Sequence, residues 1–462
     1  MLMPTLLIGI IVALTMIGAL VTYRDTFHPA VLMGPMIGFL YFYAPLILQF
    51  NNGFFGYLTE QHVMRAQWIH LAGVLSICLG LVVGPLHLRS SGGGAVEAVK
   101  QYDSKTLLKS SFLFAGLGVL SFVYGIQNVG GWTEAYGSAY GGGWIDSGWL
   151  RDLVLLCIPA LMLFTLGQGD RPVSRRQLIL VALPMMSPFL IHGLIGARRG
   201  PTFMAFAGAA MVFYMARRRR PQLPTLFIGG GLLGFLMLFL VNNRNSIYWG
   251  SNFESNIDVE EETSAYLRPN EGNDFIYGAG LVIVNDVLED YNWGTTYVTT
   301  LLVRPIPKSI WPTKYEDAAA FFNRPILTQN LGVDITKFRN VLGWTASIGA
   351  APGIVGDMWR EFWWGMVFPL FGIGWFYGHA WSRATRQGGG WVPIYCLSAS
   401  LSLYLVMQTL EAMLYRFLFG VVPMLVVLRL AEKRAKQNEE KPDPAPSESE
   451  AAAPALLTAS NS

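Results

Sequence analysis

The chain has 462 residues, of which 52% are hydrophobic and 14% are charged, and its formal net charge is +3. A soluble domain carries about 25% charged residues, so this composition excludes an ordinary soluble enzyme. It predicts an all-α polytopic membrane protein, with the lipid bilayer rather than nucleic acid as its partner.

Eleven segments are apolar enough to cross a bilayer, since a spanning helix needs about 20 mostly apolar residues. They lie at 4–22, 30–50, 66–85, 107–128, 149–168, 177–195, 200–216, 223–241, 362–380, 391–410 and 413–430. The stretch 341–358 is rich in Gly and Ala and too broken to count, which leaves a re-entrant or a surface helix open there. The chain therefore divides into spans one to eight (1–241), a large outer loop domain (242–361) and spans nine to eleven (362–430).

Lysine and arginine gather in short loops that should face the cytoplasm. These loops are 89–109, 171–176, 217–220, 383–386 and 433–436. With eleven spans all five fall on one side, which predicts an outer N-terminus and a cytoplasmic C-terminus. Residues 431–462 are rich in Ala, Pro, Ser and Glu, and we expect them to form a disordered cytoplasmic tail.

The turn Gly196-Ala-Arg-Arg-Gly-Pro201 between spans six and seven lies on the outer side. Two arginines there run against the positive-inside bias, and a helix that begins near Pro201 would offer an anion its N-terminus. Arg198 and Arg199 are therefore candidates for an anion site, and the alternative is that both extend to lipid headgroups. His192, four residues before the turn, is a weaker candidate because a lone helical His is more often a packing residue.

A second cationic segment, Leu-Val-Arg-Pro-Ile-Pro-Lys-Ser-Ile-Trp-Pro-Thr-Lys, covers 302–314. Its prolines fix three φ angles and remove three backbone donors, so it should be a shaped loop rather than a helix or strand. The side chains that it offers to a phosphate or a sugar are Arg304, Lys308, Trp311 and Lys314.

Ionisable residues at span ends complete the set, because such residues are functional candidates by default. Arg244 follows span eight at the outer boundary, and Glu411 and Arg416 open span eleven there. A structural pair between Glu411 and Arg416 is the alternative. The topology thus brings these cations to the outer membrane surface: Arg198, Arg199, Arg244, Arg304, Lys308 and Arg416. Arginine binds phosphate oxygens bidentately, so we expect a site for a lipid phosphate or pyrophosphate.

The outer loop mixes acids and amides with many aromatic residues. This composition suits carbohydrate binding, since a sugar offers both hydroxyls and apolar C–H faces. Much of it could equally be a solvated surface.

At these motifs the chain resembles the bacterial O-antigen polymerases (Wzy type), or oligosaccharide repeat unit polymerases. The matching pieces are Gly196 to Gly200, Arg304-Pro-Ile-Pro-Lys308 with Trp311 to Lys314, and the Gly-rich run Ser347 to Gly356 with Asp357 and Trp359 to Glu361. The resemblance covers most of 170–430 through short motifs, and residues 1–150 match only in hydropathy.

The resemblance implies a GT-C-like, inverting membrane glycosyltransferase of the bacterial inner membrane. Its substrates would be undecaprenyl-diphosphate-linked oligosaccharides at the periplasmic face, and its product O-antigen, capsule or exopolysaccharide. A chain-length regulator and a flippase are candidate partners. No Asp-x-Asp and no acidic pair with metal spacing occurs in the sequence, so we expect neither a metal nor another cofactor.

The expected chemistry assigns roles to the candidates. Arg198, Arg199, Arg304 and Arg416 would stabilise the leaving diphosphate, with Arg199, Arg304 and Arg416 named as catalytic. A base must take the proton of the acceptor hydroxyl. The candidates for it are Asp274, Asp357, Glu361, Glu411 and His192.

Three other functions remain open. The related O-antigen ligase has a His in its large outer loop, whereas this chain has no His between 193 and 378. A transporter or flippase of lipid-linked oligosaccharide would line a cavity along several spans, often with internal repeats, and no repeat is visible. A receptor or scaffold of polysaccharide assembly would need no in-line geometry.

Overall fold

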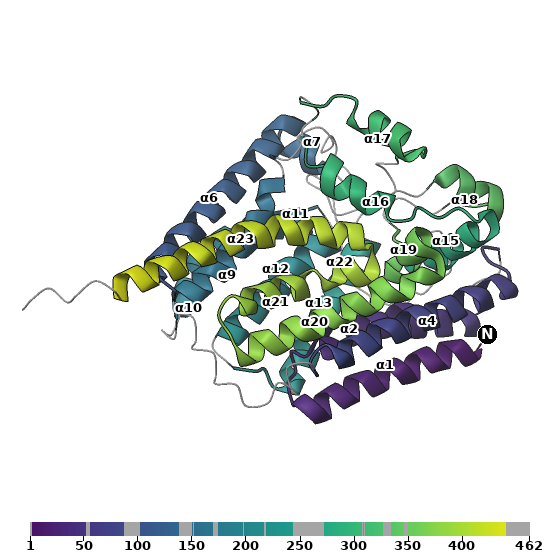
Figure 1. Ribbon diagram of the computed structural model, residues 1–462, viewed down its shortest axis with the longest axis horizontal. Coiled ribbons are helices and arrows are strands. Elements are labelled where there is room, and N and C mark those ends of the chain that lie inside the picture. The colour runs from purple at the N-terminus through teal and green to yellow at the C-terminus, as the bar shows by residue number, and fades with distance from the viewer. Residues whose placement is uncertain are drawn as a thin grey trace, which may run out of the picture.

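In the computed structural model, all regular elements of the described residues are helices. The described residues are 2–51, 56–86, 102–137, 150, 152–169, 174–196, 198–216, 219–243, 272–306, 308, 310–326, 334–345 and 350–439. Figure 1 shows long helices lying side by side, with α15 to α19 and the N-terminus at one end and the C-terminal end of α23 at the other.

The helices of the first half are α1 (Leu2–Tyr23), α2 (Pro29–Gly38), η1 (Phe39–Tyr43), α3 (Ala44–Phe50), α4 (Glu60–Val83), α6 (Ser104–Val129), α7 (Trp132–Tyr136), η2 (Leu153–Leu156), α9 (Cys157–Gly167), α10 (Arg175–Gln177), η3 (Leu178–Ala182), α11 (Leu183–Leu194), α12 (Arg199–Ala216) and α13 (Leu223–Asn242). Those of the second half are α15 (Asp274–Leu288), α16 (Thr295–Val298), η4 (Thr299–Val303), α17 (Lys314–Phe322), α18 (Ile335–Leu342), α19 (Gly353–Phe362), η6 (Trp363–Met366), α20 (Val367–Arg386), α21 (Trp391–Ser400), α22 (Ser402–Met407) and α23 (Leu410–Glu439).

Six of the described helical segments are long and apolar enough to cross a membrane. They are Leu2–Tyr23, Pro29–Phe50, Glu60–Val83, Ser104–Val129, Leu223–Leu240 and Leu410–Glu439. The other predicted spans also coincide with helices, namely the shorter apolar segments Leu153–Gly167, Ile179–Leu194, Gly200–Met215 and Trp391–Met407, and α20. The class of an all-helical, multi-pass membrane protein follows, while eleven crossings and their orientation stay a prediction.

Glycines let α4 and α20 pack with their backbones almost in contact. A Cβ on Gly80 would lie 2.2 Å from the carbonyl oxygen of Phe371, and one on Gly374 would lie 2.2 Å from that of Ile77. Small residues at a helix interface permit this approach, which drives helix association where lipid surrounds the bundle. Helices α15 and α19 pack against α4, and α19 also contacts α20.

The described part of 242–361 is not a separate polar domain. Helix α15 is buried from Asp274 to Asn285, it packs against α4, α18 and α19, and its apolar residues belong to the same core as the spans. The region was predicted as a polar outer domain because its charged and aromatic residues were weighed above this short apolar run. Helix α19, within the Gly-rich stretch that was left open between a re-entrant and a surface helix, is buried almost throughout.

The predicted tail begins too early. Helix α23 continues through Glu439, and it packs against α6, where Arg434 donates to Thr106 Oγ1 at 3.0 Å and Ala431 O accepts from Asp103 N at 3.1 Å. The residues after 431 are mostly Ala, Glu, Lys, Arg and Gln, which are strong helix formers, and this propensity outweighs their lack of apolar groups. Residues 440–462 lie outside the described part.

Candidate functional site

Arg304 lies directly after η4 and above the aromatic ring of Tyr415 in α23. Its guanidinium carbon is 4.2 Å from the ring centroid, and its Nη1 is 3.9 Å from Glu411 Oε1. The same carboxylate oxygen accepts a hydrogen bond from Thr300 Oγ1 at 2.8 Å. The Tyr415 hydroxyl in turn donates to Asp152. Two residues of α23, Tyr415 and Glu411, therefore lie at the Arg304 guanidinium, while its side chain stays 42% exposed.

Arg416, which follows Tyr415 in α23, also lies over a tyrosine ring, here one from the neighbouring helix α22. Its guanidinium carbon is 4.2 Å from the ring centroid of Tyr404 in α22, and its Nη1 donates to Ala412 O at 2.5 Å. The chain breaks between α22 and α23 at Gln408, whose backbone leaves the helical region. Tyr404 and Tyr415, on either side of this break, contact different arginines.

Arg198 approaches the same tyrosine from the turn before α12. Its backbone N donates to Gly193 O at 2.8 Å, and its side chain lies within electrostatic reach of Tyr404, Tyr136 and Arg416. Loss of water around this half-buried guanidinium lowers the pKa of Arg198 below its ordinary value. Gly200 is required here, because a Cβ would lie 2.2 Å from Tyr404 Cζ.

These contacts join three arginines that are far apart in sequence, Arg198, Arg304 and Arg416, which we call the arginine cluster. Arg304 and Arg416 both act electrostatically on Tyr415, and Arg416 acts on Arg198. Two of the cluster's guanidiniums thus lie against the rings of Tyr415 and Tyr404, and the carboxylate of Glu411 lies beside Arg304. An arrangement of this kind can bind an anion with several oxygens, because each guanidinium offers a planar set of donors.

The structure does not extend the cluster to every cation that the sequence proposed. Arg199 begins α12, but its side chain lies outside the described part, as does Arg244 as a whole. Lys308 is exposed, and its charge, like that of Arg304, acts on Lys314. His192 lies near the cluster through Tyr136, whose hydroxyl is 3.2 Å from His192 Nδ1.

Lys314 has a buried, structural position, and the substrate contact that the sequence suggested for it stays a prediction. It is 4% exposed, and its Nζ donates to the carbonyl oxygens of Val303, Arg304 and Ile306 at 3.3, 3.0 and 2.6 Å. Burial, with Lys308 and Arg304 nearby, lowers the pKa of Lys314. All three donors of its ammonium group are used, so Lys314 fixes the carbonyls around Arg304.

Trp311 also serves the local fold. Its Nε1 donates to Asp317 Oδ2 at 2.5 Å, and Thr313 donates to the same oxygen at 2.8 Å. These bonds tie the proline-rich loop to the first turn of α17. Its aromatic face remains half-exposed, so the predicted substrate contact of Trp311 stays a prediction.

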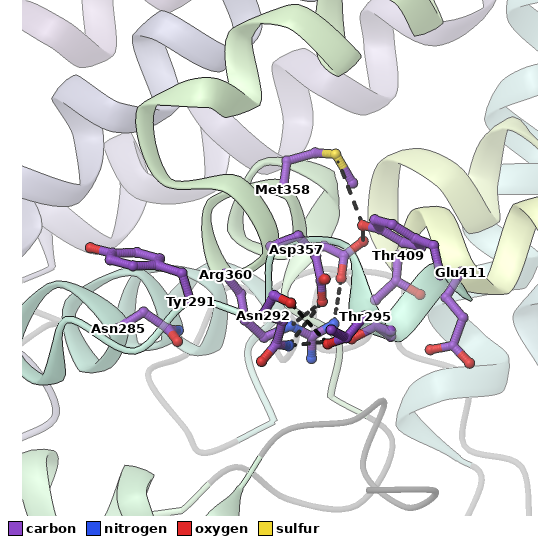
Figure 2. A network of polar contacts seen from close by, with 12 residues as sticks. Asn285, Tyr291, Asn292, Thr295, Asp357, Met358, Arg360, Thr409 and Glu411 are labelled. Atoms are coloured by element: carbon purple, nitrogen blue, oxygen red, sulfur yellow. Dashed lines mark hydrogen bonds and ion pairs between the residues drawn. The ribbon is translucent and has the colours of Figure 1, made fainter. Parts of the chain in front are cut away.

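Asp357, a candidate base, lies beside Arg360 (Figure 2). Glu361 pairs with the same arginine, and all three residues of this ionic network are buried. One carboxylate oxygen of Asp357 accepts from Arg360 Nη2 at 2.7 Å, and the other accepts from Tyr297 Oη at 2.9 Å and from Leu410 N at 3.0 Å. Burial, opposed by Arg360, raises the pKa of Asp357 to about 6. Asp357 is 0% exposed, which favours a role in holding α16 and α23 together.

Two other candidate bases are likewise occupied. Glu361 accepts from Asn292 Nδ2 at 2.9 Å and from Gly294 N at 3.2 Å, and it is fully buried. Asp274 is 2% exposed and accepts from Ala351 N at 3.0 Å, which links the first turn of α15 to the approach of α19. Glu411 is the candidate acid that the structure brings to the arginine cluster.

Tyr404, Tyr415, Tyr136 and Asp152 were not singled out from the sequence. Tyr415 had a signal, since it directly precedes Arg416 at the end of a span. The other three had none, because only the packing of distant helices brings them to the arginines.

Among the described residues, no group of three or more His, Cys, Asp or Glu side chains is placed to hold a metal ion. Comparison of the chain with protein-family models, with curated proteins and with solved structures finds no match. The geometry of the arginine cluster therefore carries the functional argument.

Proposed function

We propose that the protein polymerises lipid-linked oligosaccharide repeat units by glycosyl transfer from undecaprenyl diphosphate at the outer face of the membrane. The observation that carries this proposal is the arginine cluster, in which two guanidiniums lie over neighbouring tyrosines at the end of a membrane helix. The motifs shared with the repeat unit polymerases, Gly196 to Gly200 and Arg304 to Lys308, contribute two of its three arginines.

In the proposed reaction a hydroxyl oxygen of the acceptor sugar bonds to the anomeric carbon of the donor chain. The bond between that carbon and the diphosphate oxygen breaks, and the electron pair leaves with the diphosphate. Arg198, Arg304 and Arg416 stabilise the charge that develops on the leaving group. The site is partly removed from water, so each interaction is stronger than it would be on an open surface.

Glu411 is the proposed acceptor of the hydroxyl proton. Its carboxylate is 3.9 Å from the Arg304 guanidinium, and its side chain is 20% exposed and so open to an acceptor. A base must come within hydrogen-bond reach of the hydroxyl, which the buried Asp357, Glu361 and Asp274 do not offer.

The test is to incubate the purified protein with an undecaprenyl-diphosphate-linked repeat unit and to separate the products by gel, with and without divalent metal. The proposal requires a ladder of lengthened lipid-linked chains. A single product formed only with a lipid A core acceptor would establish the ligase instead. Movement of the lipid across proteoliposomes without new glycosidic bonds would establish a transporter.

A further inference from the structure

An exposed aromatic surface lies beside the segment that precedes α16. Helices α16 and η4 connect this segment to Arg304 of the arginine cluster. The centre of the surface is Tyr291, whose ring centroid is 6.2 Å from that of Trp293 and 6.2 Å from that of Trp363. The two tryptophans are 65% and 43% exposed, whereas Trp359 behind Tyr291 is fully buried. We call Tyr291, Trp293 and Trp363 the aromatic platform.

Both exposed tryptophans adopt backbone conformations that bulky residues avoid. Trp293 has a φ of 53°, and Trp363 has a φ of 52° with a ψ of −137°, a region that is almost restricted to glycine. Burial does not explain these conformations, because the side chains point to the surface. Such strain persists where the surroundings enforce it, and it is concentrated at ligand sites.

Here the surroundings are the buried ionic network and the end of α19. Asn292 N donates to Arg360 O at 2.9 Å, and Trp293 N donates to Glu361 O at 2.7 Å. Gly294 N donates to the Glu361 carboxylate at 3.2 Å, and the Arg324 guanidinium donates to Tyr291 O. Figure 2 shows Tyr291 and Asn292 beside this network. These bonds fix the backbone that carries Tyr291 and Trp293.

Charged side chains with both donors and acceptors surround the platform. Arg65 pairs with Asp286 at 3.1 Å, and Asp290 pairs with Arg324 and, at 2.5 Å, with Lys337. Exposed aromatic faces beside such groups match a sugar, which offers apolar C–H faces and many hydroxyls. These three ion pairs make the surface unsuited to acyl chains, because charge is costly to bring into an apolar medium.

The spacing connects the platform with the arginine cluster. Helix α16 and the π-helix η4 occupy the nine residues between Gly294 and Arg304, and they span at most about 14 Å, because a π-helix rises less per residue than the 1.5 Å of an α-helix. An oligosaccharide of a few sugars covers this length. We propose that the aromatic platform binds the saccharide portion of the substrate whose diphosphate lies at the arginine cluster, an inference that rests on the proposed function.

The experiment uses two probes on the purified full chain. One is the free oligosaccharide released by mild acid from the cell's own lipid-linked repeat, and the other is undecaprenyl diphosphate without sugar. Isothermal titration is compared for wild type, Trp293→Ala, Trp363→Ala and Trp132→Ala. Trp132 is the matched control, because it is 43% exposed but lies in α7, away from the platform.

We expect Trp293→Ala and Trp363→Ala to weaken saccharide binding about tenfold or more, since they remove the stacking faces. Their affinity for undecaprenyl diphosphate, and the saccharide affinity of Trp132→Ala, should stay within about twofold of wild type. Trp293→Phe should restore much of the saccharide affinity. Trp293→Gly relieves the backbone strain, so this variant should unfold at the same or a higher temperature while it still loses saccharide binding.

Unchanged saccharide affinity in both alanine variants, or no saccharide binding by wild type, would overturn the inference. The inference would also be overturned if the variants changed only the quenching by brominated phospholipids and left the saccharide affinity unchanged. That result would mark the tryptophans as a membrane anchor. Loss of saccharide binding in a protein that makes no ladder would retain the saccharide site and reject the polymerase. A ladder that the variants leave unchanged would retain the polymerase and reject the saccharide site.

Discussion

Arg304 and Arg416 each have one face against a tyrosine ring. Contact with an aromatic face stabilises an exposed guanidinium by about 0.5–1 kcal/mol, and it also restricts the orientation of its donors. Glu411 and Thr300 at the edge of Arg304, and the backbone of Ala412 at Arg416, restrict them further. The two arginines are therefore held in place without a ligand, which would lower the cost of ordering them at the proposed reaction centre.

Replacing Arg304 by Ala should abolish polymerisation, because the guanidinium is lost from the leaving-group site while the buried ring of Tyr415 remains in place. Arg304→Lys should recover little activity, since an ammonium group lacks the bidentate geometry. Product gels on purified variants measure both effects. Arg386→Ala, an exposed arginine in the last turn of α20, is the control and should retain wild-type product length.

Lys314→Met should loosen the loop around Arg304. Methionine keeps the apolar stem but leaves three carbonyl acceptors without their donor, at a cost of about 1–3 kcal/mol. We expect faster proteolysis within 305–313, measured by limited digestion and mass spectrometry. If the variant resists proteolysis like wild type and only its KM rises, the substrate-binding interpretation of Lys314 would be correct and the structural one would not.

The sequence named the three arginines for three separate reasons: Arg198 conflicts with the positive-inside bias, Arg304 lies in a proline-rich basic loop, and Arg416 is an ionisable residue at a span end. Their surroundings were not predictable. Tyr404 packs under Arg416 only because α22 breaks at Gln408 and Gly200 lets α12 approach, and no local pattern in the sequence states which helices meet. The burial of Asp357 and Lys314 was missed for the same reason.

At the scale of elements, α15 and α19 link the arginine cluster to the bundle. The first turn of α15 is joined to the approach of α19 through Asp274, and α19 carries Asp357, which accepts from Leu410 N at the start of α23. The apolar residues 275–284 are too few to span a bilayer, and a run of that length more often forms a buried helix. The sequence therefore contained the signal for α15, and the polar residues around it obscured the prediction.

Gly278→Ala should destabilise this connection. The added Cβ would lie 2.3 Å from the backbone oxygen of Pro352, so α15 and α19 must move apart, at a cost of about 1–3 kcal/mol. Thermal unfolding of the purified variant should occur at a lower temperature, with loss of activity. Gly116→Ala in α6, whose Cβ meets nothing within 4 Å, is the control. Equal unfolding temperatures for the two variants would contradict the tight packing of α15 on α19.

At the scale of the whole molecule, hydropathy and charge predicted the helical class and the approximate positions of the six long apolar helices in the described part of the chain. These predictions succeed because a bilayer requires long apolar segments whose backbone hydrogen bonds are formed within the segment. Side-chain geometry was not predictable in the same way. The break at Gln408 and the return of α19 toward the bundle depend on contacts between segments far apart in the chain.

The predicted topology places α17 outside and the end of α23 inside, because three spans separate them. Single cysteines in place of Glu316 and Lys436, both exposed, should react with a membrane-impermeant maleimide from opposite sides. Cys78, Cys157 and Cys396 are buried and should react slowly by comparison. Labelling of both positions from one side would contradict the predicted crossings.

The most direct test of the central claim, that Arg198, Arg304 and Arg416 form one diphosphate site, is the affinity of the purified protein for undecaprenyl diphosphate. Each Arg→Ala variant should lose about tenfold or more, because a hydrogen bond to a charged group contributes about 1.5–3 kcal/mol. Arg386→Ala should bind like wild type. Wild-type affinity in all three cluster variants, or no binding by the wild type, would contradict the account.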